Sequence, residues 1–394
     1  MNYQWPYIPS NEMYNEKMDT RNEILRAWAE KGAGKIVPTS WNHTQELVRA
    51  GLHNKVFHIK DKLTCQRSGS NLDWVVIGKD HDTPSDNQYS HSMTLRLLNQ
   101  FPTPMQFDAP EAFYYAENGL AAGDYYFTID PTYDPAHNDL SAYGFTLAEA
   151  VPAGGVLTFN WATNTMASTA KVYAYASSES TTLIMGVSVS ESASGTNLGE
   201  LKVAVQSGLN LNGVNRIRYG SNNYKESAIR QWLNSDKPAG QVWTPQTPWD
   251  RPPSWAATAD GFMRSMDADF LATVGKTHII TARAPTIEGG AAYDEMDDYF
   301  FLLSRSQVYG GVELAGANEG TPYPYYSDYS DLSAPGFGAD ANRITARNGV
   351  AAQYWLSSPY SVISYSPRFV STTGVVQNYF AYFGSGVLPA CNVI

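Results

Sequence analysis

The sequence has few charged residues, and basic residues are the scarcer kind. Lys, Arg, Asp and Glu make up 16% of the 394 residues, against about a quarter in an average globular protein. The net charge is −11 and the pI is near 5.1. Phosphate backbones and anionic lipid surfaces both attract a basic protein face. The charge balance therefore argues against a nucleic-acid-binding protein and against one that binds an anionic membrane surface.

Cysteines and long apolar runs are also scarce. Cys65 and Cys391 can either pair or remain two small buried hydrophobes. A chain of this length needs no covalent cross-link, so we favour the reduced state. No run approaches the roughly 20 apolar residues of a membrane span, and the first residues lack the pattern of a signal peptide. We expect no membrane insertion. A protein acting outside the cell would then leave by another route, such as release inside a particle.

Recognisable motifs for catalysis or cofactor binding are missing as well. There is no GxGxxG after a strand, no GxxxxGK[ST], no GxSxG and no HExxH. The acidic cluster at 294–298 lacks EF-hand spacing, so we favour a solvated loop, with calcium as the alternative. A long loop is also favoured over a metal site for a segment with no tight zinc spacing, which contains His81, Asp82, Asp86 and His91. The sequence thus predicts no catalytic residues, no metal ligands and no cofactor.

Tyr (26), Gly (31) and Pro (22) are abundant, which is typical of a loop-rich, strand-rich protein with many turns. The last forty or so residues, 354–394, mix Tyr and Phe with Ser and Asn. Rigid rings beside small adaptable polar groups are typical of binding surfaces. Within this stretch we predict the ligand-binding residues Tyr360, Ser361, Val362, Ser364, Tyr365, Ser366, Asn378, Tyr379, Tyr382 and Phe383. A second Tyr-rich loop is predicted to flank the same face with Tyr323, Tyr325, Tyr326 and Tyr329.

Hydrophobic patterns divide the chain into four segments. Residues 1–53 are helical, with helices expected at 11–32 and after Ser40 or Asn42, and form either a plain cap or an attachment segment. Residues 54–104 alternate as the first strands of a domain. Residues 105–205 have strand-like runs at the spacing of a small inserted β-sandwich module. Residues 206–394 form the main domain. The predicted ligand-binding residues, called display residues below, lie near its end.

The main domain contains a series of motifs in a specific order. YGSNNYKESAIRQWLN, GFMRSMDADF, DDYFFLLSRSQVYGG, YWLSSP, RFVSTTG and GVLPACNVI together resemble DUF6273, a domain of unknown function common in bacteria and phages. KVFHIKDKLTC and HSMTL look like the opening strands of the same domain. The resemblance implies an α+β, C-type lectin-like fold related to formylglycine-generating enzymes. One departure is LSSP at 356–359, where the domain more usually has LRSP and therefore an Arg.

The resemblance also implies a function. Long versions of this domain look like tail-associated or surface proteins of phages of Gram-positive gut bacteria. The end of the chain resembles the variable proteins of diversity-generating retroelements, in which adenines of Asn and Tyr codons are rewritten. These likenesses imply a non-enzymatic receptor-binding protein of the virion, made in the bacterial cytoplasm and carried on the phage tail. Its expected partners are a host cell-surface protein or glycan, other tail proteins through the N-terminal segment, and further copies of itself, for example in a trimer.

Two other functions stay open at this point. An oxidase related to formylglycine-generating enzymes would need a reactive cysteine pair, for which Cys65 and Cys391 are the candidates. A structural virion component would instead bury the Tyr-rich face permanently against a partner chain.

Overall fold

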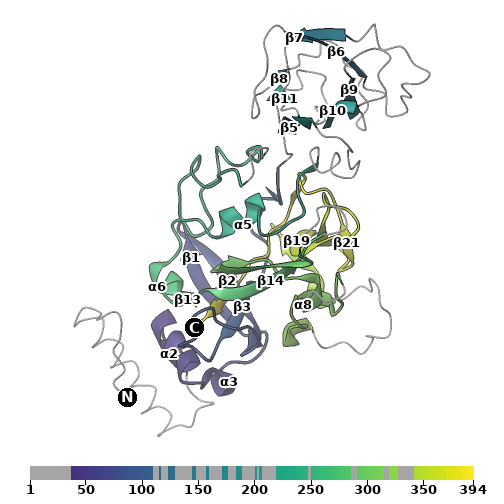
Figure 1. The fold of residues 1–394 in the computed structure, drawn as a ribbon. Helices are drawn as coiled ribbons and strands as arrows, with labels where there is room; N and C mark the ends of the chain where they lie inside the picture. The colour runs from purple at the N-terminus through teal and green to yellow at the C-terminus, as the bar shows by residue number, and fades with distance from the viewer. Residues whose placement is uncertain are drawn as a thin grey trace, which may run out of the picture.

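The computed structural model describes residues 37–109, 219–246, 250–284, 291–314, 319–326 and 341–394, and the backbone of eight short strands between 115 and 205. The helix expected at 11–32 lies outside these residues. The architecture is mixed helix and sheet, mostly sheet, with a curled half-barrel sheet (Figure 1).

The main sheet takes its strands from both ends of the described chain. Its order is β1 (Lys62–Arg67), β2 (Ser70–Lys79), β3 (Met93–Leu97), β23 (Ala390–Val393) and β13 (Val274–Gly275), and β16 (Phe300–Phe301) also pairs with β23. Cys391 of β23 is opposite Leu95 of β3 and opposite Phe300 of β16. The sheet is therefore complete only when the C-terminal strand has paired.

The main domain also contains short helices, most of which begin at a side-chain N-cap. They are α2 (Trp41–Arg49), α3 (His53–Val56), α5 (Ala228–Leu233), α6 (Ala268–Leu271) and α8 (Arg305–Tyr309). Ser40 begins α2 as predicted, because its hydroxyl accepts a hydrogen bond from the His43 amide at 3.1 Å. The Gln45 side chain donates to the Ile394 carbonyl at 2.7 Å, which ties α2 to the end of the chain (Figure 1). Ser227 caps α5, so Ser221 and Asn222 precede the helix without capping it.

The acidic cluster at 294–298 is a strand and not the solvated loop we expected. It belongs to β15 (Tyr293–Asp298), which pairs with β14 (Thr277–Ala282). Asp298 is buried and receives the Arg230 guanidinium at 2.7 Å. Asp294 lies 3.6 Å from the Lys225 ammonium. These basic partners, contributed by the segment around α5, compensate the negative charge of the strand.

Smaller sheets complete the described main domain. They are β19 (Tyr354–Pro359), β20 (Pro367–Val370) and β21 (Val376–Asn378) in one sheet, β17 (Thr345–Arg347) with β18 (Val350–Ala352), and β22 (Gly384–Ser385) with β4 (Met105–Gln106). Two 3₁₀ helices, η3 (Pro324–Tyr326) and η4 (Ala341–Arg343), lie between β16 and β17 in the chain.

The strand runs predicted within 105–205 correspond to short strands. One sheet has the order β10 (Leu183–Ser188), β9 (Lys171–Tyr175), β6 (Gly123–Thr128) and β7 (Gly144–Leu147). The others are two pairs, β8 (Leu157–Thr158) with β11 (Glu200–Leu201), and β5 (Tyr115–Ala116) with β12 (Ala204–Val205).

A buried carboxylate ties the loop between β2 and β3 to the centre of the main sheet. The Asp82 side chain is 7% exposed and accepts hydrogen bonds from Thr94 at 2.8 Å, Asn392 at 2.9 Å and Tyr323 at 2.7 Å. Burial alone would raise the pKa of Asp82, but hydrogen bonds from His81 and Asn392 lower it below its ordinary value. One side chain thus joins β3, β23 and the residue that precedes η3.

Replacing this carboxylate should destabilise the whole domain. We expect Asp82→Ala to lower the free energy of unfolding by about 3 kcal/mol or more, because hydrogen bonds to a charged acceptor contribute about 1.5–3 kcal/mol each. Asp86→Ala is the matched control, since Asp86 is in the same loop but exposed, and should change stability by less than about 0.5 kcal/mol. Urea unfolding measures both, and equal effects would contradict the role given to Asp82.

The same interaction has a pH dependence of known sign. A carboxylate whose pKa is lowered on folding stabilises the native state above its unfolded-state pKa, here 3.8, and loses that contribution as the pH falls through the lower folded-state value. The stability difference between the wild type and Asp82→Ala should therefore shrink only below about pH 4.

Candidate functional site

Two segments of predicted display residues leave the same end of the β19–β20–β21 sheet. The loop 360–366 joins β19 to β20, and the segment 379–383 follows β21. Pro359 is opposite Pro367, and Arg368 is opposite Asn378. Because adjacent strands are antiparallel, this register places both segments at one end of the strands and the turn 371–375 at the opposite end.

Six aromatic side chains at this end of the sheet form a cluster in which each ring contacts at least one other. We call them the aromatic face: Tyr219, Tyr365, Tyr379, Phe380, Tyr382 and Phe383. The centroids are 4.0 Å apart for Tyr219 and Phe380, 4.6 Å for Tyr379 and Phe383, and 4.4 Å for Tyr382 and Phe383. All six side chains are exposed or half-buried. The face is therefore a continuous, solvent-accessible set of rings that support one another.

Backbone hydrogen bonds to other parts of the fold fix the segment 379–383. The Ala381 amide donates to the Tyr365 carbonyl at 3.0 Å, and the Tyr382 amide donates to the Tyr219 carbonyl at 2.9 Å. Ala381 is itself fully buried and its carbonyl accepts from the Asp108 amide at 3.1 Å. The small buried Ala381 thus fixes the segment, while the rings on either side of it in the sequence reach the surface.

A single buried amide closes the loop 360–366. The Asn222 side-chain nitrogen donates to the carbonyls of Ile363 at 2.7 Å, Ser366 at 3.2 Å and Tyr360 at 3.3 Å. The Asn222 backbone amide donates to the Ser364 carbonyl at 2.8 Å. An Asn side chain satisfies several inward-facing loop carbonyls at once. The conformation of the loop therefore depends on a residue well over a hundred positions earlier in the sequence.

A buried ion pair supports the same loop from β20. Glu313 is 1% exposed in its side chain and receives two hydrogen bonds from Arg368, at 2.7 and 2.9 Å. Its carboxylate also accepts the Ser361 amide at 3.1 Å. The Arg368 guanidinium lies 4.4 Å from the centroid of the Tyr360 ring. Glu313 and Arg368 thereby position the first residues of the loop.

Four of the predicted display residues are in the interior, which corrects their assignment to an exposed surface. Ser364 and Ser366 are 0% and 1% exposed and face inward where Asn222 closes the loop. Tyr323 is buried with its hydroxyl on Asp82. Tyr326 is buried, and its hydroxyl accepts a hydrogen bond from Arg96 at 3.0 Å.

The remaining predicted residues are accessible or lie elsewhere. Val362 is 54% and Tyr379 is 39% exposed, and the half-buried ones are Tyr360, Ser361, Tyr365, Asn378, Tyr382 and Phe383. Tyr325 is half-buried but packs on the Arg96 guanidinium at 4.6 Å, apart from the aromatic face. Tyr329 lies outside the described residues.

Sequence reasoning missed three important residues. Phe380 and Tyr219 stack in parallel within the aromatic face, and Asn222 closes the loop beside it. Phe380 could have been found from the run Tyr379–Phe383, which is aromatic except at Ala381. Tyr219 and Asn222 gave no signal, because their relevance depends on a contact across the fold.

Two cysteines and one glutamate are further buried groups to consider for chemistry. Both cysteines are free and buried, and burial raises the pKa of the Cys65 thiol to about 11 and that of Cys391 well above its ordinary value. Burial also raises the pKa of Glu319 to about 7, but this carboxyl group accepts the Ala282 amide and the Ser358 hydroxyl, each at 2.9 Å. At neutral pH the two thiols are protonated and therefore weak nucleophiles.

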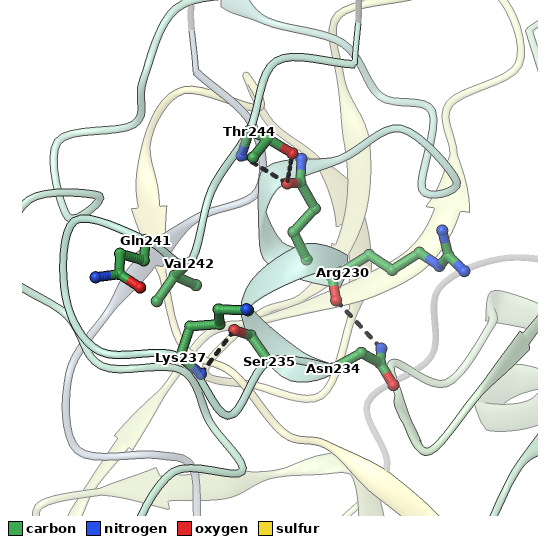
Figure 2. A pocket seen from close by; sticks show the side chains of 8 residues that line it. Arg230, Asn234, Ser235, Lys237, Gln241, Val242 and Thr244 are labelled. Carbon is green, nitrogen blue, oxygen red and sulfur yellow. Dashed lines mark hydrogen bonds between the residues drawn. The ribbon is translucent and has the colours of Figure 1, made fainter.

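A hollow of about 320 Å³ runs beside the C-terminal end of α5 (Figure 2). Its polar groups are used locally: Asn234 donates to the Arg230 carbonyl at 3.1 Å, and the Thr244 amide donates to Gln231 at 2.9 Å. The Lys237 amide likewise donates to the Ser235 hydroxyl at 3.1 Å. Most of these hydrogen bonds join neighbouring residues of the same segment, so we do not place the functional site there.

Comparison with known proteins identifies a family. The family model described as "Domain of unknown function (DUF6273)" matches residues 180–394, which is more than half of the chain, and the chain belongs to this family. The match begins inside the segment that the sequence analysis assigned to the inserted module. No curated protein and no solved structure matches the chain. In the part that the structure describes, no helix has the length and apolar character needed to cross a bilayer.

Loss of the Asn222 amide should loosen the loop 360–366 selectively. We expect Asn222→Ala to increase hydrogen exchange in a peptide covering this loop at least about tenfold, because three loop carbonyls lose the side-chain amide of Asn222 as a hydrogen-bond donor. Asn223→Ala is the matched control: Asn223 is equally buried, and within the described residues its side chain accepts the Lys225 amide and makes no hydrogen bond to the loop. Equal exchange in the two variants would show that the amide does not hold the loop.

Proposed function

We propose that this protein is a non-enzymatic binding protein carried on a phage tail, and that its aromatic face binds a target on the host cell surface. The observation that carries the proposal is the face itself, six mutually contacting rings on segments that the fold holds rigid. Such a face loses little conformational entropy on binding. The tail location rests on the resemblance of this chain to long versions of the domain, which look like tail-associated or surface proteins of phages.

The chemistry of the face suits a partner with apolar and polar surface in alternation. Phe380 and Phe383 offer only ring surface, whereas the side chains of Tyr379 and Tyr382 also carry hydroxyl groups. Aromatic rings of this kind stack on sugar rings and also act as anchors in protein interfaces. A host glycan and a host surface protein are therefore both suitable targets. Modest affinity at one site would be increased by several copies on one particle.

The second candidate is a structural virion component, and one observation favours it. Phe380 and Phe383 carry no hydrogen-bonding group, yet both are only half-buried. A partner chain that covered them would gain about 25 cal/mol per Å² of apolar surface removed from water. In this case the aromatic face would be buried in the assembled tail and unable to reach a host cell.

Removing one exposed ring should weaken binding to the target without unfolding the protein. We expect Tyr379→Ala to weaken binding of the fluorescently labelled chain to intact Gram-positive cells, or to glycans on an array, at least about tenfold, a loss of about 1.4 kcal/mol. Tyr293→Ala is the matched control, because Tyr293 is 40% exposed on β15 and Tyr379 is 39% exposed. The control should bind like the wild type.

The outcomes distinguish the two candidates. If Tyr379→Ala and Tyr293→Ala bind equally well, the aromatic face is not the binding surface. If neither the wild type nor the variants bind cells or glycans, but Phe380→Ala dissociates an oligomer seen by analytical ultracentrifugation, the structural role is correct.

If the coding segment is diversified by a retroelement, the substitutions should follow exposure. Sequencing this locus in a bacterial or phage population should find scatter at exposed positions such as Val362 and Tyr379. It should find little at Ser364 and Ser366, whose side chains are buried. Equal scatter at buried and exposed positions, or none together with the lack of a neighbouring reverse transcriptase, would remove the diversification from the proposal while leaving the binding role.

A further inference from the structure

Two histidines and an aspartate converge far from the aromatic face in the chain. His53 is the first residue of α3, Asp80 follows β2, and His91 precedes β3. One Asp80 carboxylate oxygen, Oδ1, lies 3.1 Å from His53 Nε2 and 3.1 Å from His91 Nδ1. One ligand atom from each of the three residues lies within 4.8 Å of the others. Three segments thus direct two nitrogens and one oxygen toward a common point.

The buried histidine is the unusual member of this group. The His53 side chain is 0% exposed, and neither ring nitrogen makes a hydrogen bond within the part of the chain that the structure describes. Although Nε2 lies 3.1 Å from Asp80 Oδ1, the approach lacks hydrogen-bond geometry. A buried polar atom without a partner is rare and costly, so this ring requires an explanation.

The other two members are held in place by their surroundings. Asp80 has a backbone φ of 51° and accepts hydrogen bonds from the Asn54 side chain at 2.7 Å and the Ser92 amide at 3.1 Å. The His91 ring packs against Gly51, where an added Cβ would lie 2.9 Å from Nε2. This contact places Nε2 against the backbone and leaves Nδ1 facing the carboxylate. Lys79, the nearby cation, donates to the Asn54 and Phe57 carbonyls.

We propose that His53, Asp80 and His91 bind a divalent transition-metal ion, with Zn²⁺ as the best match. Two imidazoles and one carboxylate are the donors that Zn²⁺ accepts, whereas Ca²⁺ and Mg²⁺ prefer oxygen ligands alone. Zinc ligands lie about 2.0–2.2 Å from the ion, which places neighbouring ligand atoms roughly 3 Å apart. The separation of Asp80 Oδ1 from each imidazole nitrogen, 3.1 Å, is close to this value. The side chains of Asp80 and His91 are 32% and 36% exposed, so solvent can complete the coordination.

The ion would cross-link segments that are distant in the sequence. It would join α3 to both ends of the loop between β2 and β3, the loop whose interior carries Asp82. The Asn54 hydrogen bond would orient the carboxylate as an outer-shell group, and the ion would satisfy the buried His53 nitrogen. The inference is independent of the proposed binding function, since no ring of the aromatic face takes part.

The test is direct metal binding by the full chain. The protein is purified without a polyhistidine tag, treated with a chelator and titrated with Zn²⁺ against a chromophoric competitor. We expect one equivalent of tightly bound Zn²⁺, and Co²⁺ in its place should give visible d–d absorption. His91→Ala and Asp80→Asn should each weaken Zn²⁺ binding at least about tenfold. Excess Ca²⁺ or Mg²⁺ should not displace the ion.

His58→Ala is the matched control, because His58 lies five positions after His53 but its side chain is 81% exposed. It should bind Zn²⁺ like the wild type. Circular dichroism of each metal-free variant shows that it is folded, and His91→Ala is expected to pass because the side chain is at the surface. The proposal is overturned if wild type and both site variants bind Zn²⁺ alike, if His58→Ala causes the same loss, or if Ca²⁺ displaces the ion.

Discussion

The buried carboxylate of Asp82 accepts hydrogen bonds from residues that lie up to 310 positions away from it in the sequence. Thr94 is on β3, Asn392 is on the final strand, and Tyr323 precedes η3. Because a charge in the interior is tolerated only when its hydrogen-bonding capacity is satisfied, these three groups have to be present together. The carboxylate therefore couples the loop after β2 to the closure of the main sheet by β23. The conformations of the neighbouring segments depend on that closure.

In the aromatic face, too, buried groups fix the backbone, while the side chains of the rings are exposed or half-buried. Buried groups, namely Asn222, Ala381 and the ion pair of Glu313 with Arg368, hold the backbone of both segments. The rings above this support are at least partly exposed, and substitutions are tolerated best at such loop positions. This division explains how one fold could present many different surfaces. It also explains why Ser364 and Ser366, which are similar to the display residues in composition, belong to the support.

Much of the local structure was predictable from the sequence. Ser40, one of the two caps expected for the second helix, begins α2, and the alternating residues expected as the first strands of the domain form β1, β2 and β3. The acidic run at 294–298 was assigned wrongly. Its charge suggested solvent, but pairing with β14 and basic partners such as Arg230 made it a strand. Local composition does not report partners that arrive from elsewhere in the chain.

The candidate site divides in the same way. The sequence by itself determined that Tyr, Phe, Ser and Asn gather near the C-terminus and that the main domain carries the family motifs. The tertiary structure decided which of those residues are exposed, because exposure depends on strand register and on Asn222 and Glu313, whose contacts the sequence does not reveal. It likewise decided that His53, Asp80 and His91 meet. Residues separated by a helix, two strands and a long loop become neighbours only when the chain has folded.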